Sequence, residues 1–155
     1  QAQVWEKGKL EDIGMATAID VGDSLDIHPK NKVVPAHRFV LWALAKEYGR
    51  DVECEGPLPK GVRVKGEKMV LSFKNAKGLY VKSDFGDKSD TGVRYLMIAG
   101  EDGVYHPAQS KIERGKLVAW SPSVPRPVHI KYCTEDYCRG TIYNEAGLPA
   151  YPFEW

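Results

Sequence analysis

Three residues in the stretch VGDSLDIHPKNK, at positions 21–32, have side chains that can take part in ester hydrolysis. A serine hydroxyl can attack a carbonyl carbon, and an imidazole can accept the proton of that hydroxyl. A nearby carboxylate can fix the imidazole tautomer and stabilise the imidazolium that forms. Ser24, Asp26 and His28 supply one group of each kind. The stretch therefore raises the hypothesis of a serine hydrolase, to which the Gly-Asp-Ser-Leu tetrapeptide, the Asp-Ile-His-Pro run or both belong.

The residues on either side of this loop predict a strand before it and a helix after it. The nearly continuous apolar run at 15–21 lies between two glycines and is typical of a strand that is buried on both faces, as in a parallel sheet. At 34–48, good helix formers and apolar residues at helical spacing predict a helix that stops at Gly49. In open α/β sheets the reacting groups lie just beyond the carboxyl ends of strands, which is the position of this loop.

The sequence pattern changes near residue 50. Short β-branched or aromatic runs recur at roughly 10-residue spacing and are separated by turn residues. About seven strands are expected, in the segments GVRVKG, KMVLSFK, GLYVK, VRYLMIAG, VYHPAQSKIE, KLVAWS and PVHIKYC. The tail NEAGLPAYPFEW is expected to lie extended across a surface. We therefore predict a mostly β fold, with an antiparallel β-sandwich over 53–155 preceded over 1–52 by the last strand and helix of an α/β domain.

The first of these two regions cannot be stable by itself. One strand and one helix leave apolar faces uncovered, because open parallel sheets need several strands with helices over both sides. Residues 1–52 are therefore expected to pack against the β-sandwich, or against material from outside this chain.

Charge and hydropathy argue against two classes of partner. Lys and Arg total 22 and Asp and Glu total 21, which gives a formal net charge of +1 without a block of like charges. This balance lacks the basic footprint of a nucleic-acid-binding protein. No apolar run approaches the roughly 20 residues that a membrane span requires. We expect neither nucleic acid nor a membrane as a partner.

Metal and cofactor patterns are not recognisable in the sequence. The Cys-x-x-Cys and His-x-x-x-His spacings of zinc sites do not occur, and DVGDSLD lacks the ligand order of a calcium loop. No metal and no cofactor are therefore expected. Three cysteines leave at least one unpaired within the chain. Cys133 and Cys138 can close a small disulfide loop in an oxidising compartment or remain two thiols, and Cys54 has no obvious mate.

Several blocks of the chain resemble one enzyme family. GMATAIDVGDSLDIHPKNK and the later RFVLWALAKEYG resemble the closing block of the catalytic domain of sialate O-acetylesterases and related carbohydrate acetylesterases, serine hydrolases of the SGNH superfamily. The resemblance continues through GPLPKGVRV, LSFKNAKGLYVK, MIAGEDGVYHPA, SPSVPRPVHIKY and IYNEAGLPAYPF. It covers nearly the whole chain, and the blocks agree in order and spacing. It implies the C-terminal part of a carbohydrate O-acetylesterase that removes acetyl groups from sugar hydroxyls.

The resemblance implies roles for individual residues of the loop. His28 matches the family's catalytic histidine, which activates the serine and later protonates the leaving sugar hydroxyl. Asp26 is implied as its carboxylate partner. The wider superfamily places this aspartate three residues before the histidine, where this chain has Leu25, so that Asp23 or a backbone carbonyl is the alternative orienting group. Ser24 is expected to be an exposed or loop-capping serine, because the family's nucleophile follows the first strand of the domain.

The family's nucleophilic serine and most of its oxyanion-hole donors are implied to lie upstream of Gln1. We therefore expect this polypeptide alone to lack esterase activity. Its implied partners are that upstream part and an acetylated sugar, and its implied location is outside the cytoplasm, since most members of the family are secreted, periplasmic or lysosomal. Neither the sugar nor the acetyl position is indicated by the sequence.

Two other classes of function remain open. Trp120, Trp155 and the tyrosines between 132 and 151 could offer flat faces to sugar rings, which would make the β-sandwich a non-catalytic carbohydrate-binding domain. Aromatic side chains in a sandwich more often fill its core. The chain could also have a purely structural role, in which it completes the fold of another chain.

Overall fold

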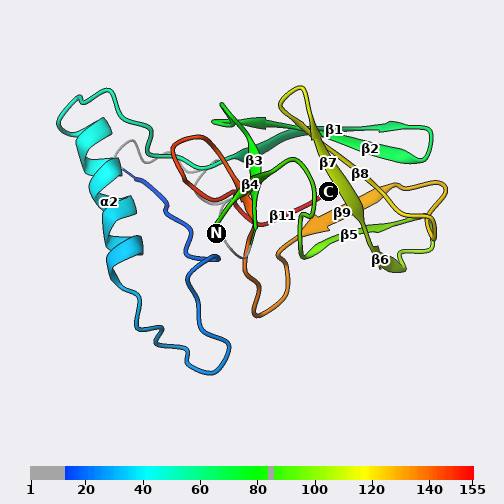
Figure 1. Cartoon of the computed structure of the whole chain (residues 1–155), viewed down its shortest axis with the longest axis horizontal. Coiled ribbons are helices and arrows are strands. Elements are labelled where there is room, and N and C mark those ends of the chain that lie inside the picture. Colours follow the sequence, from blue (N-terminus) through cyan, green and yellow to red (C-terminus); the bar gives the residue numbers. More distant parts are fainter. Residues whose placement is uncertain (1–12, 84–85) are drawn as a thin grey trace.

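The computed structural model describes residues 13–83 and 86–155 and is shown in Figure 1. Among these residues it contains the helix α2 (Val33–Lys46) and eleven short strands. The strands are β1 (Leu58–Lys65), β2 (Lys68–Lys74), β3 (Tyr80–Lys82), β4 (Lys88–Ser89), β5 (Leu96–Ala99), β6 (Tyr105–Pro107), β7 (Gln109–Glu113), β8 (Lys116–Trp120), β9 (His129–Tyr132), β10 (Ile142–Tyr143) and β11 (Phe153–Glu154). No helix in this part of the chain is long and apolar enough to cross a bilayer.

The strands form three antiparallel sheets. Their orders are β1-β2-β8-β7, β10-β3-β4 and β11-β9-β5-β6. The predicted mostly β fold with antiparallel pairing is therefore confirmed. Each of the seven expected segments contains a strand, but VYHPAQSKIE divides into β6 and β7, which pair in different sheets. Strands β4, β10 and β11 contain only two residues each, which is too short for a periodic signal. The sequence did not predict them as strands.

Alternating burial along the strands builds the core between the sheets. In β7, Ser110 and Ile112 face inward while their neighbours are exposed, as the two-residue period of a strand requires. The central side chains of the core are fully or almost fully buried, and they include Met69, Leu71, Ile98, Leu117, Ile130 and Tyr132. The hairpin between β7 and β8 turns on Arg114 and Gly115, whose φ angles are 50° and 69°. Two successive positive φ values are typical of the tight turn that matches strand twist.

Helix α2 lies at one side of the strands and follows a long loop (Figure 1). It begins one residue before the predicted start and ends two residues before the predicted end. At its first turn, the backbone N–H of Val34 donates to Oδ1 of Asn31 at 3.3 Å. Gly49, with φ at +59°, takes the left-handed conformation that favours glycine after a helix. The expected stop at Gly49 is therefore confirmed.

The strand expected at 15–21 is not formed. Residues 13–18 have no regular secondary structure, and residues 19–21 belong to a turn. A strand needs a partner to complete its hydrogen-bond ladder, and within the described residues no strand lies beside this segment. The side chain of Ile19 packs instead against the β-core. Gly140 leaves room for it, since a Cβ atom there would lie 2.5 Å from Cδ1 of Ile19.

Candidate active-site loop

The loop with the predicted catalytic residues is shaped by two aspartates. The backbone N–H of Leu25 donates to Oδ1 of Asp23 at 2.9 Å. In the same way, the backbone N–H of His28 donates to Oδ1 of Asp26 at 2.8 Å. Each aspartate thus accepts a hydrogen bond from the residue two positions later, which is the geometry of an Asx turn. Two consecutive turns of this kind give the exposed loop a defined backbone course.

The structure brings Asp26 and His28 together through the backbone of the histidine. The Asp26 carboxylate binds the N–H of His28, and within the described residues no hydrogen bond reaches the imidazole ring. Ser24 and His28 are both exposed, and the serine hydroxyl forms no hydrogen bond with the ring. Asp26 therefore positions the main chain of His28 here, while its predicted role as the partner of the imidazole stays a prediction. The geometry contains no Ser24–His28 pair that could act as nucleophile and base.

An open hollow of about 1120 Å³ lies between this loop and the β-domain. One wall comes from residues 15–29 and includes Ser24, Asp26 and Pro29. The opposite wall comes from the connection between β9 and β10 and from the C-terminal tail. Its residues are Cys133, Glu135, Asp136, Tyr137, Cys138, Tyr151 and Pro152. The loop is therefore flanked on one side by polar and aromatic side chains from the far end of the sequence.

A buried ion pair fixes the chain immediately before this loop. The Nη1 and Nη2 atoms of Arg38 donate to the two carboxylate oxygens of Asp20, at 2.7 Å each. Nη1 also donates to the backbone carbonyl of Thr17 at 2.6 Å. The two charged side chains are only 6% and 10% exposed. Paired, charge-assisted hydrogen bonds of this kind are strong and set the relative orientation of both partners.

Tyr143 of β10 joins this ion pair to the β-domain. Its hydroxyl donates to Oδ2 of Asp20 at 3.0 Å. Burial, followed by the negative charge of Asp20, raises the pKa of the Tyr143 hydroxyl, which keeps it protonated as a donor. We call Asp20, Arg38 and Tyr143 the clasp, because they link the segment before the loop, helix α2 and the β-domain.

A second contact between the same three parts lies next to the clasp. The backbone carbonyl of Met15 accepts hydrogen bonds from Nε1 of Trp42 at 3.0 Å and from the hydroxyl of Tyr151 at 2.6 Å. Trp42 belongs to α2, and Tyr151 belongs to the C-terminal tail. Side chains thus satisfy the carbonyls of Met15 and Thr17, and the backbone N–H of Gly140 donates to the carbonyl of Ile19 at 3.4 Å. These contacts explain how the segment holds its place without a strand partner.

The clasp makes the stability of the protein depend on pH. Burial alone would raise the pKa of Asp20, but the hydrogen bonds and charge of Arg38, with the Tyr143 hydroxyl, hold it below its ordinary value of 3.8. A carboxylate whose pKa is lowered by folding contributes stability that is fully present above its unfolded pKa and lost as pH falls through the folded pKa. Urea denaturation from about pH 6 to about pH 3 is expected to show a smaller acid-induced loss of stability in Asp20→Asn than in the wild type.

Asp26→Asn is the matched control for this prediction, because it changes an exposed carboxylate in the loop that follows Asp20. It is expected to keep the acid dependence of the wild type. If Asp20→Asn followed the wild-type curve at every pH, the clasp would not be the source of this dependence.

Metal-ligating side chains are not clustered in this part of the molecule. Among the described residues, no group of three or more His, Cys, Asp or Glu side chains could hold a metal ion. His37 lies exposed in the first half of α2, and His106 and His129 lie in strands β6 and β9.

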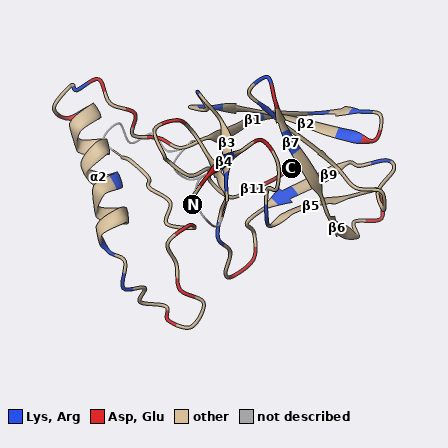
Figure 2. Ribbon diagram, in the orientation of Figure 1, with Lys and Arg blue, Asp and Glu red and all other residues tan. Residues whose placement is uncertain are grey.

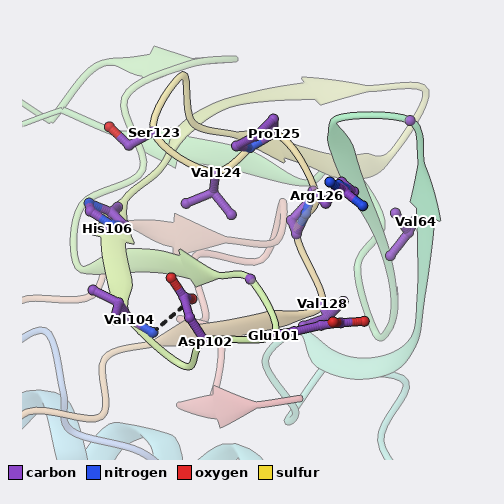
Figure 3. Close-up of a pocket in the computed structure, with 13 residues that line it drawn as sticks. Val64, Glu101, Asp102, Val104, His106, Ser123, Val124, Pro125, Arg126 and Val128 are labelled. Atoms are coloured by element: carbon purple, nitrogen blue, oxygen red, sulfur yellow. Dashed lines mark hydrogen bonds between the residues drawn. The ribbon is translucent and has the colours of Figure 1, made fainter.

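A second hollow, of about 560 Å³, lies at the opposite end of the β-domain (Figure 3). Its labelled side chains come from the connections β5–β6 and β8–β9, from strand β6 and from the β1–β2 hairpin, and they include Arg126, Glu101 and four valines. Asp102 also lines it, and one of its carboxylate oxygens, Oδ1, accepts the backbone N–H of Val104 at 3.1 Å. No Trp, Tyr or Phe is among the residues that line this hollow, and His106 is the one aromatic side chain in its lining.

Most of the C-terminal tyrosines considered for sugar stacking are part of the core. Tyr132, Tyr143 and Tyr151 are all buried. Tyr137 is half-buried, and Trp155 is half exposed at the end of the chain. The tyrosines therefore do not form a shared open platform, and their packing follows the usual behaviour of aromatic residues in a sandwich.

Comparisons with known proteins identify a similar solved structure. No family model and no curated protein matches this sequence. Among solved structures, it is similar to XAC1771, a novel carbohydrate acetylesterase from Xanthomonas citri, with a TM-score of 0.80 and 31% sequence identity over 90% of this chain. The chain is similar to part of a carbohydrate acetylesterase. The predicted resemblance to carbohydrate acetylesterases is thereby confirmed at that level. The chain spans 32% of the length of the Xanthomonas enzyme.

Sequence reasoning missed the clasp, although a signal for it was present. Arg38 stands among the apolar residues that recur at helical spacing, and Asp20 stands in the apolar run before the loop. A charged residue on each of two apolar faces is rare unless the two are paired. The contribution of Tyr143, more than 100 residues later, had no sequence signal at all.

Proposed function

We propose that this chain is the C-terminal part of a serine-type carbohydrate O-acetylesterase of the SGNH superfamily, related to the sialate O-acetylesterases. His28 acts as the base that activates the nucleophilic serine and later protonates the leaving sugar hydroxyl. The serine and most oxyanion-hole donors come from a preceding part of the same enzyme. The similarity to XAC1771 over 90% of this chain, at 31% sequence identity, carries this proposal.

In this proposal, residues 1–52 belong to the α/β hydrolase domain, and residues 53–155 form the β-sandwich that braces it. Residues 1–12 lie outside the described part of the structure. The clasp connects the two regions in this proposal. Asp20, two residues before Gly22, accepts hydrogen bonds from Arg38 of α2 and from Tyr143 of β10. Acetylated sugar is the proposed substrate, and a location outside the cytoplasm follows from the family likeness.

Exposed apolar side chains around the loop support the proposal that another part of the enzyme packs against it. Leu25 and Ile27 are 96% and 91% exposed, and on α2 the side chains of Val33, Phe39 and Val40 are exposed as well. Figure 2 shows α2 almost entirely without charge, whereas charges of both signs are scattered over the β-domain. Exposed large apolar side chains that follow one another along a short stretch of chain are typical of a contact with other protein. The upstream part of a hydrolase domain, with its sheet and helices, is the occupant we propose.

The first test is the activity of the chain by itself. Purified protein is expected to leave a chromogenic acetyl ester uncleaved above the rate of buffer, because it supplies a base but no activated nucleophile. The His28→Ala variant should give the same background rate. Turnover that disappears in His28→Ala would mean that a nucleophile is present in this chain, and the proposed division of the active site would then be wrong.

A further inference from the structure

Two buried cysteines flank a short exposed turn opposite the active-site loop. Cys133 directly follows β9, and Cys138 precedes the run into β10. Both side chains are buried, whereas residues 134–136 between them are exposed. The two side chains belong to the same buried cluster, they lie close enough for each thiol to affect the pKa of the other, and both line the hollow beside residues 22–29. The pair therefore lies at the base of the wall that the β-domain presents to the loop.

The core fixes the chain on both sides of this turn. The hydroxyl of Tyr132, which is fully buried, accepts the backbone N–H groups of Thr141 at 2.7 Å and Ile142 at 3.1 Å. The backbone N–H of Cys133 donates to the carbonyl of Tyr95 at 3.0 Å. Cysteines whose side chains point apart cannot be joined without backbone movement. Here the core holds the backbone with the two thiols close together, so that the folded protein can accommodate the bond.

We propose that Cys133 and Cys138 form an intramolecular disulfide that closes the loop 133–138, by exchange with a small-molecule disulfide such as oxidised glutathione. One cysteine thiolate attacks a glutathione sulfur and releases one glutathione thiolate, which leaves a mixed disulfide. The other cysteine thiolate then attacks the protein sulfur of that mixed disulfide and releases the second glutathione thiolate. Two protein thiols are oxidised, one glutathione disulfide is reduced to two thiols, and the two protons pass to the released thiolates.

The surroundings of the thiols determine when this exchange takes place. Burial raises the pKa of both cysteines. Since the thiolate is the nucleophile, the folded protein reacts slowly. The bond therefore forms during folding, before the loop packs against the core. It forms whether or not the chain takes part in ester hydrolysis.

The crosslink acts on the wall that faces the active-site loop. Tyr137 lies inside the closed loop, and its ring atom Cε2 lies 3.8 Å from where a Cβ atom on Gly22 would be. Gly22 begins the loop that carries Asp26 and His28. A closed loop 133–138 therefore holds Tyr137 against the start of the active-site loop, and it also removes freedom from the unfolded chain.

The test compares protein refolded with a mixture of oxidised and reduced glutathione and protein refolded with a reducing agent. Free thiols are alkylated, and trypsin then cuts after Lys131 and Arg139 to release one peptide with both cysteines. After oxidative refolding, this peptide is expected to carry no alkyl group. Its mass should be two hydrogen atoms below that of the same peptide with two free, unalkylated thiols. Cys54 should be alkylated in both samples. The midpoint of thermal unfolding should be about 4–8 °C higher for the oxidised protein.

Cys54→Ser is the matched control and is expected to reproduce both the mass change and the rise in unfolding temperature. Cys138→Ser should show the lower unfolding temperature under either condition. The mass measurement on the wild type stands even if this variant fails to fold. Alkylation of both Cys133 and Cys138 after oxidative refolding, or a disulfide to Cys54 or to a second chain, would overturn the proposal.

Discussion

Replacement of Arg38 by alanine is expected to lower the free energy of unfolding of this chain by about 3–5 kcal/mol. The substitution removes three hydrogen bonds and leaves the Asp20 carboxylate, which is only 10% exposed, without its cation. Breaking a buried ion pair from one side is costly because the remaining charge stays out of water. Urea denaturation at neutral pH, followed by circular dichroism, measures this loss.

Two further variants test whether the loss of stability comes from breaking the clasp or from removing any positive charge. Arg38→Lys keeps the charge but cannot donate to both oxygens of Asp20 in the planar geometry of the guanidinium group, and an intermediate loss is expected. Lys46→Ala removes a largely exposed lysine that lies 4.0 Å from Glu55, and it should cost no more than about 1 kcal/mol. A loss for Arg38→Ala as small as that for Lys46→Ala would show that the clasp does not stabilise the fold.

The second large effect is expected on catalysis. In the assembled enzyme that contains the nucleophile, His28→Ala should lower kcat by about 10²–10⁴-fold, the range typical of a lost general base. KM should change little, since the proposed role of the imidazole lies in proton transfer and not in binding of the sugar. Initial rates on an acetylated sugar, with acetate as the measured product, separate the two constants.

His37→Ala is the matched control for this variant, because His37 is also exposed but lies in α2. It should keep the kcat of the wild type. Asp26→Asn keeps a side-chain oxygen that can accept the backbone N–H of His28 but removes the negative charge, so it tests whether Asp26 acts on that turn or on the ring. Equal kcat values for His28→Ala and His37→Ala would contradict the role assigned to His28.

Local patterns predicted most of the elements in this fold. The alternation in KMVLSFK and the glycine after the helix act within a few residues, and β2 and the end of α2 lie where these signals indicate. The strand predicted at 15–21 was wrong. An apolar composition indicates that a segment is buried, but a buried segment need not be a strand. Carbonyls of this run are bound by Trp42, Arg38 and Tyr151 instead, and no local pattern contains that information.

The candidate site was predicted in part for the same reason. His28 and its aspartates lie within a few residues of each other, so their spacing could be recognised in the sequence. The clasp depends on the contact between Asp20 and Tyr143, and the wall formed by 133–138 depends on how the β-domain docks against the loop. Contacts over such separations are set by the tertiary fold and leave no periodic trace in the chain.

Mixing this chain with the separately produced upstream part of the proposed enzyme tests the proposed shared active site most directly. The measured quantity is the rate of acetate release from an acetylated sugar by each part alone and by the mixture. We predict that neither part is active alone, that the mixture is active, and that a mixture made with His28→Ala stays at the background rate. A mixture whose rate is the same with His28→Ala as with the wild type would contradict the central claim that this chain supplies the catalytic base.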